Sequence, residues 1–137
     1  MGNFENKEFL VWTQDFSVEI EELDNHHKEM IKLINTLRDA MSSNVGSEKT
    51  NELIVDLFNY ANYHFGAEEA LFLLKDYPFT LEHCEKHLEY RENLSVLRDM
   101  VEAGIDSALP DLLTYLNKWW TNHIMLEDKK FSPYLKA

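Results

Sequence analysis

The stretch LDNHHKEMIKLIN at residues 23–35 has the apolar spacing of an amphipathic helix and carries two adjacent histidines. Its apolar residues belong to a longer series at positions 20, 23, 30, 34, 37 and 41, and residues spaced in this way share one helix face. His27 continues this series, whereas His26 is rotated about 100° from it and lies beside Glu22 and Glu29. We therefore predict that His27 faces the core and that His26 faces outwards or sideways.

Three further segments show helical spacing, and polar breaks separate them. The stretch SSNVGS ends the first segment, and we expect Ser47 to cap a second one that reaches KDYPF. Thr80 is expected to cap the third segment and Gly104 to follow its end. Pro110 suits an early position of a fourth segment, which runs towards Lys130.

Short breaks between four long helices predict an all-α, antiparallel up-down-up-down four-helix bundle, because short loops force neighbouring helices to pack side by side. We place this bundle at about residues 19–130 of a single domain that spans residues 1–137. Residues 1–18 lack a helical period and are expected to form a non-helical arm over apolar surface. The arm carries Phe4, Phe9, Leu10, Trp12 and Phe16.

Composition narrows the classes of partner. The formal charge of -12, from 25 acidic and 13 basic residues, would repel phosphate backbones and anionic lipids, so we expect neither nucleic acid nor membrane partners. One cysteine, Cys84, excludes an internal disulfide, and we expect it to be a packed or half-buried thiol. No long apolar run and no signal-peptide pattern is present, so we expect a cytoplasmic protein, and we expect it to be monomeric.

Histidines and acids continue the inward faces of the predicted helices. HFGAEE places His64 and Glu68 four residues apart, HCEKH does the same for His83 and His87, and His123 continues the fourth stripe. Five of the six histidines thus take positions where hydrophobic residues are expected. Burying a neutral polar group without a partner costs about 1–3 kcal/mol, so the joint pattern predicts a metal site.

The number of predicted ligands indicates two ions. A single zinc ion takes four protein ligands or three and a water, so five histidines with a carboxylate are too many for one ion. Two ions need bridging carboxylates, of which Glu68 is one, and HIMLED offers Glu127 or Asp128 as the other. An ideal helix favours Glu127, since a residue five positions after His123 lies about 140° round the helix. Spacing alone leaves the choice open.

Four motifs in order give the chain a resemblance to the hemerythrins, specifically the single-domain bacterial hemerythrins. They are LDNHH, HFGAEE, HCEKH and WWTNHIMLED, where the family usually has I-D-x-Q-H, H-x-x-x-E-E, H-x-x-x-H and W-L-x-x-H-I-x-x-x-D. The resemblance implies two iron ions with an oxo or hydroxo bridge. It assigns His83, His87 and His123 to one iron, His27 and His64 to the other, and Glu68 and Asp128 as bridges between them.

The resemblance also implies a function. The iron with two histidines keeps a vacant position where dioxygen would bind reversibly, for oxygen storage, delivery or buffering, and the protein would not be an enzyme. Matching positions suggest an oxygen pocket formed by Met30, Phe65, Trp119, Trp120 and Ile124. The alternatives are a di-iron enzyme acting on peroxide or nitric oxide, an oxygen or redox sensor, and iron storage or a structural metal bundle.

Two residues depart from the family pattern. His26 replaces the usual Gln, and it is either an exposed residue, one that contacts a ligand, or an extra or exchanged ligand. Trp120 replaces the usual Leu, and it either packs in the core or narrows access to the vacant iron position.

Overall fold

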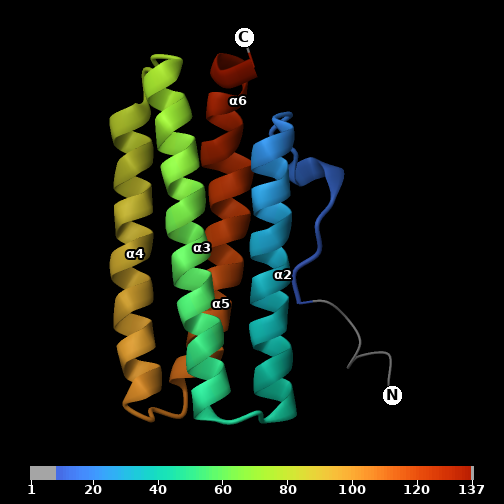
Figure 1. The fold of residues 1–137 in the computed structure, drawn as a ribbon, viewed down its shortest axis with the longest axis vertical. Helices are drawn as coiled ribbons and strands as arrows, with labels where there is room; N and C mark the ends of the chain where they lie inside the picture. Colours follow the sequence, from blue (N-terminus) through green and yellow to red (C-terminus); the bar gives the residue numbers. More distant parts are fainter. Residues whose placement is uncertain (1–8, 137) are drawn as a thin grey trace.

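The computed structural model describes residues 9–136 and is built from four long helical columns. The columns are α2 (Glu21–Ser43), α3 (Ser47–Leu74), α4 (Thr80–Glu102) and a fourth composed of α5 (Ala108–Asn122), the π-helix η2 (His123–Asp128) and α6 (Lys129–Lys136). Figure 1 shows them side by side, and contacts join α2 to α3, α3 to α4, α4 to α5 and α5 to α2. The predicted all-α four-helix bundle is confirmed.

Two predicted helix caps are wrong by one residue. Ser47 and Thr80 are the first residues of α3 and α4, and the capping positions belong to Gly46 and Phe79. The Thr80 hydroxyl donates a hydrogen bond to the carbonyl of Tyr77 at 2.6 Å, so it serves the preceding turn and not the new helix.

The C-terminal end of α4 and the start of α5 follow the sequence signals. Gly104 lies one residue beyond the C-cap of α4 and has a φ of +79°, a conformation that glycine adopts without strain. Pro110 lies in the first turn of α5, where its missing N–H costs no helical hydrogen bond.

The fourth column is longer than predicted, because it continues past Lys130 to Lys136. Pro133 lies inside α6 but does not end it. Phe131 and Leu135 lie one turn apart and are both buried, so their packing holds this last segment in a helix.

The N-terminal arm is described from Phe9, and Phe4 lies outside the described residues. It contains one 3-10 turn, η1 (Gln14–Phe16), so the arm is not wholly non-helical. Asp24 on α2 anchors it by accepting hydrogen bonds from the Ser17 hydroxyl at 2.6 Å and the Val18 backbone N–H at 2.8 Å. The arm therefore covers the bundle beside the start of α2.

Buried aliphatic and aromatic side chains fill the bundle along its length. Between residues 9 and 136, none of the helices combines the length with the apolar composition of a membrane-spanning segment. Cys84 is half-buried and carries a free thiol. At one level of the bundle, buried histidines and carboxylates interrupt the apolar core and form the site described next.

Candidate metal centre

Seven buried polar side chains converge between the four columns. His27 comes from α2, His64 and Glu68 come from α3, His83 and His87 from α4, and His123 and Asp128 from η2. None of them is more than 4% exposed. The histidines divide into a two-histidine group, His27 and His64, and a three-histidine group, His83, His87 and His123.

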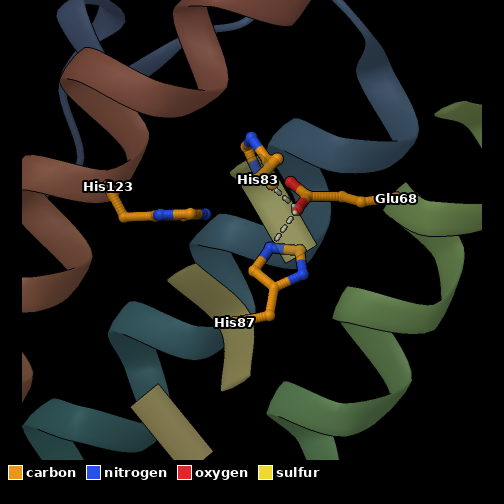
Figure 2. A group of neighbouring side chains, drawn as sticks. All are labelled: Glu68, His83, His87 and His123. Atoms are coloured by element: carbon orange, nitrogen blue, oxygen red, sulfur yellow. Dashed lines mark ion pairs between the residues drawn. The ribbon is translucent and has the colours of Figure 1, made fainter. Parts of the chain in front are cut away.

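Glu68 lies between the two groups and turns one carboxylate oxygen towards each. Its Oε2 lies 3.1 Å from His64 Nε2 and 3.8 Å from His27 Nε2. Its Oε1 lies 3.0 Å from His87 Nε2 and 3.3 Å from His83 Nε2. Figure 2 shows this carboxylate between His83 and His87, with His123 facing them from the left of the view. The placement is that of a carboxylate shared by two neighbouring positions.

Asp128 repeats this arrangement from the fourth column. Its Oδ2 lies 3.1 Å from His27 Nε2, whereas its Oδ1 lies 3.0 Å from both His83 Nε2 and His123 Nε2. Two buried carboxylates therefore connect the same pair of histidine groups.

The π-helix explains why Asp128 and not Glu127 occupies this place. His123–Asp128 forms a wider helical turn than an α-helix, so residues five apart share one face. Asp128 is fully buried, whereas the Glu127 carboxylate accepts a hydrogen bond from Lys130 Nζ at 3.0 Å on the exposed side. The preference for Glu127 from ideal helical geometry is wrong, because it assumed 3.6 residues per turn throughout.

The donor atoms of the centre lie at ion-pair distances from one another, but most of them form no hydrogen bond. Both oxygens of Glu68 and of Asp128 are buried without a hydrogen bond, as is Nε2 of each histidine in the three-histidine group. Leaving such groups unpaired costs about 1–3 kcal/mol each, and more when the group is charged. Cations would supply the missing partner, so the residues present fit metal binding.

Two sets of donors each lie close enough together to hold a metal ion. One set consists of Glu68 with the three-histidine group, and the other of Glu68 and Asp128 with the two-histidine group; within each set the donor atoms lie within 4.8 Å of one another. Imidazole nitrogens with carboxylates suit zinc and divalent iron, among other transition metals.

Without cations, the imidazoles compensate the two carboxylates. Burial lowers the pKa of His27 and of His83, but the contacts with Asp128 and Glu68 outweigh it and raise each pKa to about 9. Burial likewise acts to raise the pKa of Glu68, yet the surrounding imidazoles hold it well below the usual value. The carboxylates are thus anionic, and metal ions would displace protons from the histidines.

Two of the histidines have hydrogen-bonding partners on the side away from the centre. His87 Nδ1 lies 2.8 Å from the Glu69 carboxylate, and His64 Nδ1 lies 3.0 Å from His26 Nδ1. His26 is 7% exposed and faces sideways onto His64, outside both sets of converging donors. The sequence did not single out Glu69, although the paired acids of HFGAEE placed it next to Glu68.

Aromatic rings pack on the centre, and three of them belong to residues of the predicted oxygen pocket. Phe65 stacks on His87 with ring centroids 3.8 Å apart, and Trp119 stacks on His123 at 4.2 Å. Trp120 lies 5.9 Å from His64 and stacks on Phe65 at 5.6 Å. The remaining predicted residues, Met30 and Ile124, are both buried. Trp119 thus lies against the three-histidine group, whereas Trp120 is the indole beside the two-histidine group.

The sequence of the chain is similar to those of known proteins of one family. The family model described as the hemerythrin HHE cation binding domain matches residues 18–135. A bacteriohemerythrin of Stenotrophomonas maltophilia is 30% identical over 128 residues, which cover 93% of this chain and 82% of that protein. A bacteriohemerythrin of Pseudomonas paraeruginosa is 34% identical over 121 residues, covering 87% of this chain and 76% of that protein.

The fold is also similar to that of solved hemerythrin structures. The crystal structure of a wild-type hemerythrin superposes with a TM-score of 0.86 at 25% sequence identity, covering 94% of this chain and 99% of that one. Sequence and backbone therefore agree over the bundle and over the segments that carry the converging donors.

Proposed function

Because this chain belongs to the hemerythrin family, we propose that it binds dioxygen reversibly at a buried pair of iron ions. The observation that carries the proposal is the placement of Glu68 and Asp128, each with one oxygen towards either histidine group. A single ion would need only one oxygen of each carboxylate, whereas two ions would use both oxygens. The biological role of the protein would be oxygen storage, delivery or buffering.

The chain's own residues would hold the two ions unequally. His83, His87 and His123 would hold one iron and His27 and His64 the other, with both carboxylates common to the two and an oxo or hydroxo bridge completing the pair. The two-histidine side then has one protein donor fewer. When bound, ferrous iron would supply the electrons and the vacant coordination position that dioxygen binding requires.

The residues that line the site favour reversible oxygen binding over enzymatic catalysis. The wall residues Phe65 and Trp120 are fully buried, and their rings lie 6.0 Å and 5.9 Å from that of His64, so they shield this histidine from bulk water. Exclusion of water protects a reactive bound species from hydrolysis and proton leakage. Among these wall residues there is no acid or base to deliver a proton.

A second candidate is a di-iron enzyme that acts on peroxide or nitric oxide. The observation that favours it is His26, a buried imidazole one hydrogen bond from His64. Such a group is of the type used for acid–base catalysis. The carrier function remains the better supported, since His26 lies behind His64 and not among the wall residues.

One spectroscopic experiment separates these functions. The protein is loaded with ferrous iron without oxygen, exposed to air, and then returned to an oxygen-free atmosphere while the visible spectrum is recorded. A charge-transfer band that appears with oxygen and disappears with its removal is the expected result. Irreversible conversion to ferric protein, or rapid consumption of added peroxide or nitric oxide, would support the enzyme. Bound iron without any oxygen-dependent band would support storage or a structural role.

A further inference from the structure

Two histidines of the metal centre, His87 and His64, form hydrogen bonds on the side away from it, and the two acceptor groups differ in charge. A histidine that holds a metal through Nε2 carries its proton on Nδ1, so His87 donates to the Glu69 carboxylate and His64 donates to His26. One acceptor is an anion and the other is an imidazole. The two acceptors serve different groups, since His87 belongs to the three-histidine group and His64 to the two-histidine group.

His26 is fixed as a neutral acceptor by its surroundings. Because its Nδ1 accepts the proton of His64, its own proton must lie on Nε2. A doubly protonated imidazole has no nitrogen free to accept, so a ring that accepts this proton is uncharged. Its ring packs against Tyr63 and Tyr60 with centroids 5.1 Å and 6.1 Å away, so it cannot rotate freely away from His64.

Glu69 is an anion at the edge of the site. Its side chain is partly exposed to solvent, and its Oε2 lies 2.8 Å from His87 Nδ1, so it takes the ionised form that is usual for a glutamate in contact with water. The nearby Arg91 offsets part of the negative charge, but its Nε donates to Asn62 at 2.7 Å, whereas Glu69 lies 2.8 Å from His87 Nδ1.

An anionic acceptor makes a metal-bound imidazole a stronger electron donor than a neutral one does. A stronger donor stabilises the ferric state more than the ferrous state and so lowers the reduction potential. We propose that the unlike acceptors Glu69 and His26 make the three-histidine position the first of the two to be oxidised, with His26 acting as a positioning residue for His64. This inference rests on the proposed pair of iron ions but not on oxygen binding.

In the redox step, one ferricyanide ion would take one electron from the ferrous iron that His83, His87 and His123 would hold, and would become ferrocyanide. No proton would have to be transferred. The electron of the iron that His27 and His64 would hold would be removed only by a second equivalent of ferricyanide.

The positioning role of His26 is tested with the metal-free protein and zinc, which has no redox chemistry. Loss of a hydrogen-bonding partner of a ligating histidine typically costs about 10–100-fold in metal affinity. His26→Leu should weaken binding of one of the two zinc ions by such a factor, and His26→Gln, whose amide oxygen accepts a hydrogen bond, should restore it. Equal affinities in His26→Leu and the unsubstituted protein would overturn the positioning role.

The order of oxidation is tested by anaerobic titration with ferricyanide, followed by Mössbauer spectra of the half-oxidised protein. Glu69→Gln keeps an acceptor for His87 but removes its charge, so the first potential should rise while the second stays nearly the same. His26→Gln exchanges one neutral acceptor for another and should move neither. Glu85→Gln, which removes an exposed charge from the same helix as His87, is the matched control.

The outcomes separate this inference from the proposed function. A first potential that rises in Glu69→Gln but not in Glu85→Gln supports it, even if the protein fails to release oxygen. A first potential unmoved in Glu69→Gln, or moved equally in both variants, overturns it.

Discussion

Trp120 is the largest fully buried side chain of residues 9–136 and, with His26, one of two departures from the family pattern that lie beside the two-histidine group. Its ring lies against Phe65 and His64, and its Nε1 donates a hydrogen bond to the Tyr90 hydroxyl at 3.2 Å. The indole therefore packs in the core and also fills space next to His64, so the two interpretations of this residue are compatible.

Trp120→Leu should change both stability and gas access. The variant leaves a cavity and removes a partner of the Tyr90 hydroxyl, which should lower the free energy of unfolding by about 2–4 kcal/mol in urea titrations. The space opened beside His64 should raise the rates of oxygen association and autoxidation in stopped-flow measurements. Trp12→Leu, in the arm, is the control; rates in Trp120→Leu that match those of this control would contradict the gating role.

His27→Ala should remove one of the two iron ions. His27 contacts both carboxylates but none of the three-histidine group directly, so the other position keeps its donors. Iron analysis should find about half of the iron held by the unsubstituted protein, whereas His26→Gln should retain both ions. Equal iron loss in the two variants would contradict the assignment of His27 as the ligand.

The π-helix η2 is the element on which the second shared carboxylate depends. It is a single widened turn between two regular helices, and such turns occur frequently at functional sites. Without it, Asp128 would be rotated away from His123 and the three-histidine group.

Asp128→Asn and Glu127→Gln form a matched pair of neighbouring charge removals. An amide cannot supply two anionic oxygens, so Asp128→Asn should bind fewer than two metal ions per chain, whereas Glu127→Gln should bind two. Metal analysis after loading and dialysis gives the ratio. Loss of metal in Glu127→Gln, with retention in Asp128→Asn, would contradict the role of the π-helix.

Much of the bundle follows from the sequence, because the period of apolar residues marks each inward face. That period placed His27 inside, and the structure finds it fully buried beside both carboxylates. It did not predict η2, since a regular period assumes an unbroken α-helix; only the family resemblance indicated Asp128. It did not predict the contacts of Asp24, Glu69 or His26, because these depend on the packing of one column against the next or against the arm.

At the scale of the whole molecule, the stability of the bundle is linked to charge at its centre. The metal-free protein contains two buried carboxylates whose partners are imidazoles with raised pKa values, His27 and His83 at about 9. An unfolded histidine has a pKa of about 6.5. The folded state therefore binds protons more tightly, and this stabilisation is complete below the unfolded value and lost as pH rises through about 9.

The metal-free protein should accordingly have a lower Tm at a pH of about 9.5 than at about 6. Metal ions replace the protons, so the zinc-loaded protein should not show this fall, and its Tm should exceed that of the metal-free protein at both pH values. Differential scanning calorimetry provides the comparison. A metal-free Tm that stays level or rises over the same range would contradict the proton-sharing arrangement.

The central claim is that one molecule of dioxygen binds reversibly per pair of iron ions. The most direct test begins by saturating the ferrous protein with oxygen and removing the free gas. The protein is then diluted into oxygen-free buffer, and an oxygen electrode measures how much dioxygen it releases. The expected result is one dioxygen for every two iron ions, repeated over successive cycles. Release of no oxygen, with ferric iron left after the first cycle, would contradict the claim.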